Sequence, residues 1–183
     1  IDPNSVHGPY AQSWVDEWHR TQVSEHSYYC SSFKFKKGLV AEKESSAYNL
    51  HVADKMWLNK SFKNTILQKI ARCEMDSKRY VYSDLGFILL QQVVESIVKL
   101  PMDLYLAKEF YAPMGLQRTM YLPLQKYSKE EIMPTAANDF LRRQDLCGYV
   151  HDEAAACMGG ISGNAGLFST ASEVAKIYQM ILN

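Results

Sequence analysis

Apolar side chains recur three and four residues apart in several stretches of the chain, and this spacing predicts amphipathic helices. One such helix is expected between Ser61 and Cys73, with Ser61 as its N-cap. A shorter helix is expected around Ala11 to Arg20. The rest of the first fifty residues is rich in aromatic side chains and has no regular period. It is therefore expected to be irregular, with an exposed turn or edge at Lys34 to Gly38.

The most regular helical pattern follows Tyr82. Ser83 or Asp84 can cap this helix, and Pro101 either ends it or opens the next one, because proline fits a first helical turn. One side of the helix is expected to carry a wide apolar stripe, formed by Leu85, Ile88, Leu89, Val93, Ile97 and Val98. Stripes of this kind are typical of helices that pack against a core.

Three further elements are expected downstream. A helix after Pro101 continues to about Tyr111, with Gly115 in the position of a C-terminal cap. Residues 147–151 are expected to form a short strand. The sequence Thr170-Ala171-Ser172-Glu173 is a capping box that opens an amphipathic helix. Between the strand and this helix, residues 159–166 contain four glycines and predict a tight loop. Together these patterns predict a mostly α fold with short β segments.

Composition narrows the function classes. Hydrophobic residues make up 47% of the chain and charged residues 22%, as in ordinary globular domains. A chain of 183 residues buries roughly 70% of its unfolded surface, so one domain is the natural expectation and two small subdomains the alternative. The 20 basic residues balance the 20 acidic ones, which argues against a dedicated nucleic-acid binder. No apolar stretch approaches the ~20 residues of a membrane span.

Neither the chain ends nor the cysteines identify a compartment. The chain starts at Ile1 without an initiator Met or signal segment and ends at Asn183 within a helical pattern, so a piece of a longer protein is expected. The cysteines have no zinc-type spacing, and free thiols are favoured over disulfides, which also remain possible. They are Cys30, Cys73, Cys147 and Cys157.

Three short motifs suggest catalysis but have ordinary explanations. Residues 31–34 (SSFK) fit S-x-x-K, in which a lysine one helical turn later activates a serine, but no helical period surrounds them. Residues 160–164 (GISGN) nearly match the nucleophile elbow G-x-S-x-G, with Asn164 in place of the last glycine. His151, Asp152 and Glu153 are consecutive and cannot all face one metal ion, so a structural histidine is favoured.

A fourth motif is Tyr82-Ser83-Asp84-Leu85-Gly86, which alone indicates only a half-buried tyrosine before a helix. Its context changes that interpretation. Three stretches resemble, in order, segments of the serine β-lactamase and penicillin-binding-protein superfamily. The second motif and its helix are matched by residues 82–94 (YSDLGFILLQQVV). The F-x-P-L-G-M-x-x-T segment is matched by residues 110–119 (FYAPMGLQRT), and the V-H-D…G-H-A-G-L-F-S-T segment by residues 148–183. The likeness is greatest to the class C and esterase-type branch, and within it to domains attached to family 3 glycoside hydrolases in Bacteroidetes.

This resemblance implies acyl transfer through a serine ester, with no metal or organic cofactor. Tyr82 falls on the tyrosine of the branch's Tyr-x-Asn motif, a general base or proton relay, and Asp84 falls on its asparagine. Asp84 exchanges an amide for a charge and removes two donors. Ser83, Gly163 and Asn164 are candidate substrate-binding residues, although Asn164 stands where close relatives carry histidine. The family also implies a periplasmic or cell-envelope location and a small-molecule or peptide substrate.

Two of the superfamily's three motifs are missing. The sequence has no Lys-Thr-Gly or His-Thr-Gly, and the Ser31 motif lies in what resembles the loop region after the true nucleophile helix. The expected fold is therefore the helical subdomain of the β-lactamase/DD-peptidase-like fold, without most of the antiparallel sheet. Residues 80–183 form its motif-bearing region and residues 1–79 a weakly matched lead-in.

Two functions stay open at this point. The first is a fragment of a penicillin-recognising serine hydrolase, inactive alone, whose parent acts on peptidoglycan peptides, esters or β-lactams. The second is a non-catalytic helical binding or scaffold module derived from that family. In either case the missing sheet predicts an exposed apolar seam and self-association. The seam is expected at Met158, Ile161, Leu167, Phe168 and aromatic residues among the first fifty.

Overall fold

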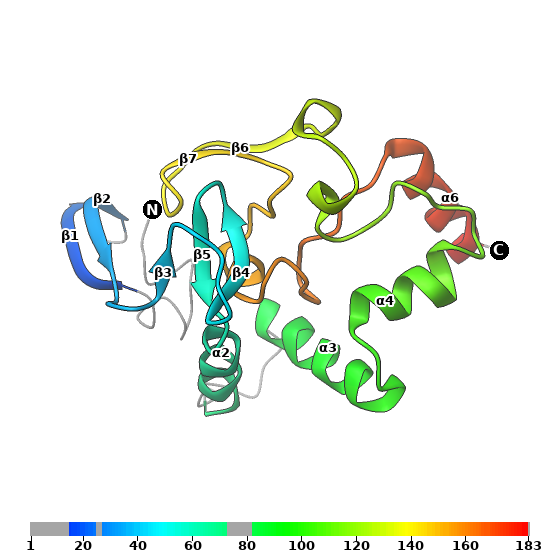
Figure 1. Ribbon diagram of the computed structural model, residues 1–183, viewed down its shortest axis with the longest axis horizontal. Helices are drawn as coiled ribbons and strands as arrows, with labels where there is room; N and C mark the ends of the chain where they lie inside the picture. The colour runs from blue at the N-terminus through cyan, green and yellow to red at the C-terminus, as the bar shows by residue number, and fades with distance from the viewer. Residues whose placement is uncertain (1–14, 25–26, 73–81, 183) are drawn as a thin grey trace. The chain divides into compact units, whose positions relative to one another are not determined.

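The computed structural model describes residues 15–24, 27–72 and 82–182 (Figure 1). These residues form helices and small antiparallel sheets. The chain divides into two compact units. The first extends to Tyr82 and includes Cys157–Gly159, and the second comprises Ser83–Ala156 and Gly160–Asn183.

The first unit begins with an antiparallel hairpin of β1 (Val15–Ser24) and β2 (Ser27–Phe35). The helix expected around residues 11–20 is therefore wrong for residues 15–20, and residues 11–14 lie outside the described residues. Pairing with a partner strand outweighs a short local helical pattern, because strand preference depends on cross-strand neighbours. The expectation of an irregular segment is wrong at β1 and β2 for the same reason, while residues 1–14 and 25–26 lie outside the described residues.

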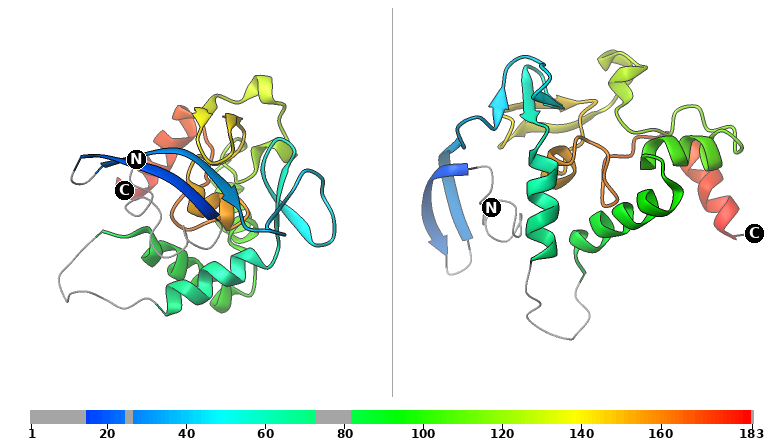
Figure 2. Two further views of the ribbon diagram at one scale, coloured as in Figure 1. Left: turned by 90° about the vertical axis from the view of Figure 1, so that its left-hand side faces the viewer. Right: turned by 60° about the horizontal axis from the view of Figure 1, so that its bottom comes forward.

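A second sheet and a helix complete this unit (Figure 2). Its strand order is β3 (Val40–Ala41), β5 (Met56–Asn59) and β4 (Tyr48–Ala53). Helix α2 (Phe62–Ala71) follows directly, as its apolar spacing predicts, and buries Phe62, Ile66 and Ile70. Ser61 occupies the N-cap position without capping, because its hydroxyl donates to Asn59 Oδ1 at 2.8 Å.

The second unit carries most of the helices. Its elements are α3 (Asp84–Val98), α4 (Met102–Leu106), a π-helical turn η2 (Ala107–Tyr111), 3-10 turns η3 (Pro123–Gln125) and η4 (Lys129–Glu131), strands β6 (Pro134–Asp139) and β7 (Gln144–Cys147), α5 (Glu153–Cys157) and α6 (Ala171–Leu182). Pro101 opens α4 rather than only ending α3. The strand expected at 147–151 lies earlier, at β7, where it pairs with β6.

Helix α3 has the predicted ends but not the predicted burial. Among its apolar residues Ile88 is completely buried, and the side chain buried with it is the polar Gln91. Val93 is 51% exposed and Ile97 is 73% exposed. With Leu89, three of the six residues of the predicted stripe are thus exposed, so the expected packing is wrong for these three.

The hairpin of β6 and β7 is fastened by a buried ion pair. Arg142 Nη2 donates to Asp139 Oδ2 at 2.9 Å and to the His151 carbonyl oxygen at 2.6 Å. Among the described residues, neither Cys147 nor Cys157 forms a disulfide. Among the described residues, no single helix has the length and apolar content of a membrane span, although α3 and the segment Met102–Tyr111 pass this test as a pair bent by 69°.

Candidate active site

The tyrosine motif lies where the first unit ends and the second begins. Tyr82 is 67% exposed, and Ser83, in extended backbone geometry, is the N-cap of α3. The Ser83 hydroxyl oxygen accepts from the Leu85 N–H at 3.3 Å, which satisfies one of the free donors of the first turn. Asp84 is the first residue of the helix, where the helix dipole favours a negative charge. The local sequence thus fixes Ser83 and Asp84 at a helix start.

The glycine loop, residues 159–166, approaches α3 closely at Gly163. A Cβ atom there would collide with the backbone carbonyl of Phe87, so only glycine allows this approach. Gly166 adopts a φ of +111°, and a side chain on it would meet the carbonyl oxygen of Gly160. The glycines of this loop therefore serve packing, and Gly163 sets its distance from the helix that begins at Asp84.

Gln91 binds the loop to α3. Its side chain is 2% exposed, its Oε1 accepts from the Gly163 N–H at 3.1 Å, and its Nε2 donates to the Ile161 carbonyl at 3.3 Å. The same Nε2 donates to Glu95 Oε1 at 3.0 Å, and that oxygen also accepts from the Met102 N–H at 3.0 Å. The buried Gln91 amide thus joins the loop to α3, and Glu95 extends the network to the start of α4.

Asn164 and Ser162 are engaged with each other and with α5. The Ser162 hydroxyl donates to Asn164 Oδ1 at 2.6 Å, and Asn164 Nδ2 donates to Asp152 Oδ1 at 3.0 Å. Asp152 Oδ1 also accepts from the Ala155 N–H at 2.7 Å in the first turn of α5. Ser162 is 1% exposed, so it has the burial of a structural residue rather than of an accessible nucleophile.

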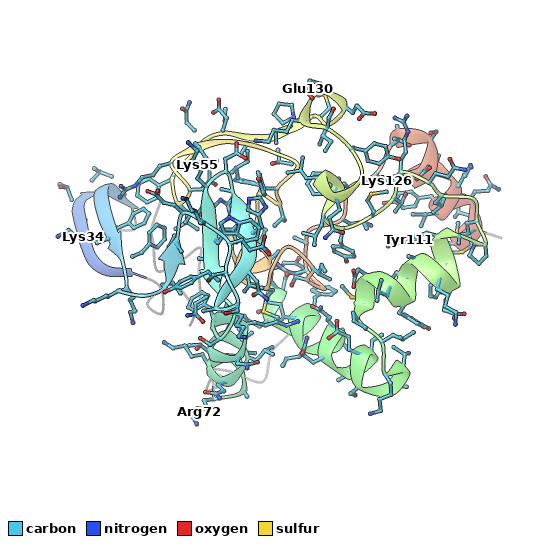
Figure 3. The ribbon with its side chains drawn as sticks, in the orientation of Figure 1. Lys34, Lys55, Arg72, Tyr111, Lys126 and Glu130 are labelled. Atoms are coloured by element: carbon cyan, nitrogen blue, oxygen red, sulfur yellow. The ribbon has the colours of Figure 1, made fainter. Side chains whose placement is uncertain are left out.

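Tyr121 supports the loop from a second direction. Its hydroxyl donates to the Ser162 carbonyl oxygen at 3.3 Å. Burial, with Tyr111 (labelled in Figure 3) and Asp103 nearby, raises the pKa of Tyr121 to about 12. Its phenol therefore stays protonated at neutral pH and remains a donor to the loop.

Comparison with known proteins identifies the family. The family model described as Beta-lactamase matches residues 43–183, which include the tyrosine motif, α3 and the glycine loop. The chain belongs to the β-lactamase family. This confirms the resemblance to the serine β-lactamase and penicillin-binding-protein superfamily. The likeness to domains of family 3 glycoside hydrolases stays a prediction.

Curated relatives of this β-lactamase-family chain carry the name "Putative D-alanyl-D-alanine carboxypeptidase". The proteins from Salmonella agona and Salmonella paratyphi B are each 33% identical to it, and the protein from Salmonella schwarzengrund is 34% identical. Each match covers 74% of this chain and 34% of the relative, so the chain spans about a third of the length of these proteins. No solved structure matches it.

The other sequence candidates lie elsewhere in the β-lactamase-family chain. Ser31 and Lys34 lie on β2, where three residues span roughly 10 Å, and not on the helical turn that S-x-x-K requires. His151 is exposed, and its carbonyl oxygen accepts from Arg142. Among the described residues, no group of three or more His, Cys, Asp or Glu side chains is arranged to hold a metal ion.

The structure brings Ser83, Asp84, Gly163 and Asn164 into one unit, with α3 and the glycine loop joined by Gln91. Their roles in catalysis or substrate binding stay predictions. Sequence reasoning missed Gln91, because a glutamine within an apolar helix carries no signal of its partner in a loop. It also missed Asp152 as a cap of α5, although an aspartate before a helix is a recognisable N-cap signal.

The role predicted for Glu173, as the second half of a capping box, is wrong. The predicted capping box is half formed, because the Glu173 N–H donates to Thr170 Oγ1 at 3.4 Å while its carboxylate turns elsewhere. The carboxylate accepts from the Gln117 N–H at 2.8 Å and from Thr119 Oγ1 at 2.6 Å. Burial opposes ionisation, but hydrogen bonds from Thr119, Gln117 and Arg118 outweigh it and lower the pKa of Glu173. Glu173 thus connects α6 to the segment before Met120.

Proposed function

We propose that this chain supplies the second motif and the glycine loop of a serine hydrolase that forms an acyl-enzyme with peptidoglycan peptides or β-lactams. The observation that carries the proposal is the β-lactamase family match over residues 43–183, which contain Tyr82-Ser83-Asp84 at the start of α3. The names of the Salmonella relatives favour a peptide ending in D-alanyl-D-alanine as the substrate class. Esters are a further substrate class of the same mechanism.

In this mechanism a serine hydroxyl attacks the substrate carbonyl and loses its proton to a neighbouring base. Tyr82 is proposed as that base or as a relay, and its exposure supports access to an incoming group. An ordinary phenol has a pKa near 10, so the role requires a nearby cation to favour the phenolate. The lysine of S-x-x-K would provide this cation from a segment outside the 183 residues.

Asp84 is proposed to contact that lysine. A carboxylate accepts hydrogen bonds but donates none, so it matches an ammonium group and not a substrate carbonyl. Ser83 already accepts from the Leu85 N–H, and its own proton remains available to a substrate oxygen. Gly163 and Asn164 are bound to Gln91 and Asp152, so we propose that they shape the cleft as parts of a fixed loop.

The parent protein, in this proposal, contributes the nucleophile and the third motif, and it acts in the periplasm or cell envelope, where peptidoglycan is found. The 183-residue chain contains no K-T-G or H-T-G sequence, which would provide the third-motif strand beside the oxyanion. We therefore propose that it does not form an acyl-enzyme by itself.

A fluorescent penicillin tests both parts. The full-length protein containing this chain should give a covalently labelled band that unlabelled penicillin prevents, whereas the isolated chain should give none. Absence of labelling and of peptide hydrolysis in the full-length protein would favour the non-catalytic binding module. Specific labelling of the isolated chain at Ser31 would overturn the assignment of the nucleophile to another segment.

A further inference from the structure

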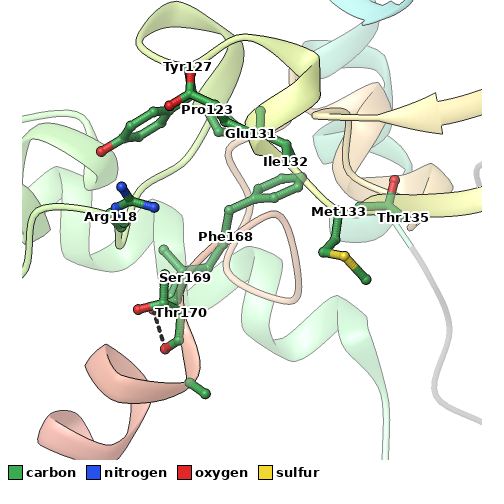
Figure 4. A pocket seen from close by; sticks show the side chains of 12 residues that line it. Arg118, Pro123, Tyr127, Glu131, Ile132, Met133, Thr135, Phe168, Ser169 and Thr170 are labelled. Carbon is green, nitrogen blue, oxygen red and sulfur yellow. Dashed lines mark hydrogen bonds between the residues drawn. The ribbon is translucent and has the colours of Figure 1, made fainter.

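A pocket of about 520 Å³ lies in the second unit, apart from the tyrosine motif (Figure 4). Its walls come from residues 118–135 and from residues 167–171 before and at the start of α6. The volume falls within the range of small-ligand sites. None of Tyr82, Ser83 or Asp84 lines it, so a ligand here would not occupy the proposed catalytic motif.

Arg118 gives the pocket a positive charge. Its guanidinium carbon lies 5.7 Å from the centre of the Tyr127 ring, a geometry that suits cation–π attraction and orients the side chain. In the part of the chain that the structure describes, the guanidinium has no carboxylate partner. Its planar fork of donors is therefore available to a ligand.

The backbone beneath Arg118 is fixed to α6. The Arg118 N–H donates to both carboxylate oxygens of Glu173 at 3.0 Å, and Glu173 lies in the first turn of that helix. Thr119 Oγ1 and Ser169 Oγ lie 2.7 Å apart, which joins the two walls a second time. These hydrogen bonds hold the two walls of the pocket together without a ligand, and such preorganisation lowers the entropic cost of binding.

Helix α6 starts directly after Ser169 and Thr170, which also line the pocket (Figure 4). The first turn of this twelve-residue helix carries partial positive charge, and the N–H groups of Glu173 and Val174 in it already donate to Thr170. The Glu173 carboxylate in the same turn offsets this charge, so Arg118 is the group that favours an anion over a neutral ligand.

The remaining wall is apolar. Phe168, Ile132 and Met133 line it, and Met133 is 85% exposed. A flexible, exposed methionine beside an aromatic ring is suited to cover a bound apolar group. A ligand that fits both walls carries a negative charge at one end and an apolar group at the other.

Two nearby carboxylates limit the charge of the ligand. Glu131 lines the pocket and accepts from the Ser128 N–H at 3.1 Å, while Glu173 lies behind Arg118. A doubly charged phosphate would be repelled by both and attracted by one arginine. A single carboxylate matches the guanidinium fork in shape and charge.

We propose that this pocket binds a small monocarboxylate bearing an apolar or aromatic group, with the carboxylate on Arg118 and the apolar group against Phe168 and Met133. The binding is non-covalent and requires no turnover. The binding proposal is therefore independent of the acyl transfer to serine in which Tyr82 is proposed to move the proton.

Calorimetric titration of the full-length protein with N-acetylphenylalanine and with its amide tests the proposal. The two probes differ only in carboxylate against carboxamide, and the acid should bind roughly tenfold more tightly or better, as expected for a charge-assisted pair. The difference should decrease at high salt, because the site is partly open to solvent.

Variants locate the site. Arg118→Gln should abolish the preference for the acid, and Arg118→Lys should retain part of it, since lysine keeps the charge but not the fork. Arg72→Gln is the matched control, because Arg72 is an exposed arginine at the end of α2 in the first unit (Figure 3) and should leave both affinities unchanged.

Three results would overturn the proposal. They are equal affinity for acid and amide, an unchanged preference in the Arg118→Gln protein, and no saturable binding of the acid up to about 10 mM, beyond the weak end of specific affinities.

Discussion

Tyr82 is the residue on which the proposed chemistry depends. In the full-length protein, Tyr82→Phe should leave folding intact and lower turnover by roughly 10²–10⁴-fold, because the change removes only the phenolic oxygen that would move the proton. Steady-state kinetics with a D-alanyl-D-alanine peptide or a chromogenic β-lactam would measure it.

Tyr178 provides the matched control for this change. It is 63% exposed on α6, close to the 67% exposure of Tyr82, and lies outside the motif. Tyr178→Phe should therefore leave turnover unchanged. A Tyr82→Phe enzyme that is as active as this control would restrict Tyr82 to packing.

Glu173 makes stability depend on pH. Its pKa in the folded chain is lowered from the ordinary 4.5, so the stabilisation is present above that value and is lost as the pH falls through the folded pKa. The thermal stability of the wild-type chain should therefore fall as the pH drops below about 4.5. Glu173→Gln should cost about 1–3 kcal/mol at neutral pH, since an amide cannot accept from all three donors.

The same variant gives the discriminating comparison. The difference in stability between wild type and Glu173→Gln should shrink as the pH falls from 6 to about 3, because protonation removes the same charge. A constant difference across that range would contradict the assigned hydrogen bonds.

At the scale of elements, Gln91 holds the glycine loop to α3. Gln91→Ala should destabilise the chain by about 2–4 kcal/mol, because it leaves the Gly163 N–H and the Ile161 carbonyl without partners and opens a cavity. Gln92→Ala is the control, since Gln92 Nε2 is buried without a hydrogen-bond partner and its loss breaks no bond of the loop. Chemical denaturation measures both, and equal losses would contradict the special role of Gln91.

Two glycines of this region should respond in opposite directions to alanine. Gly163→Ala pushes the loop away from the Phe87 carbonyl and should lower the free energy of unfolding by about 1–3 kcal/mol. Gly86→Ala in α3 meets nothing within 4 Å and should gain about 0.5–1 kcal/mol from helix propensity. Thermal denaturation of the two variants checks the signs, and a neutral Gly163→Ala would refute the close approach.

Helix ends were predictable from sequence because their signals are local. Ser83 and Pro101 delimit α3 and α4 where expected, and Thr170 precedes α6 as expected. The hairpin of β1 and β2 was not predictable, because its stability comes from pairing rather than from residue preference. Gln91 escaped prediction for a similar reason, since its partner Gly163 lies 72 residues further along the chain.

At the scale of the whole molecule, several large apolar side chains are exposed. Met158 is buried, so the predicted seam is wrong at that residue, and Leu167 is 44% exposed. Larger exposures occur on α3, α4 and α6, at Leu90, Val93, Ile97, Leu104, Ile181 and Leu182. Exposed apolar surface tends to find a partner.

Self-association of the isolated chain therefore stays a prediction, now centred on these helices. Light scattering over a dilution series should reveal a concentration-dependent species, most simply a two-fold dimer. Ile97→Lys should weaken it, because it places a charge on a residue that is 73% exposed. Scattering from a monomer at every concentration would contradict the prediction.

The contact of Gly163 with the Phe87 carbonyl also constrains how such sequences can vary. A β-carbon at position 163 is tolerated only if α3 shifts, and a shifted α3 moves the amide at position 91 out of reach of the loop. Substitutions at these two positions should therefore appear together in related proteins, as linked pairs rather than singly. A combinatorial library of positions 91 and 163, selected for folding, would expose this linkage as a strong dependence of each position on the other.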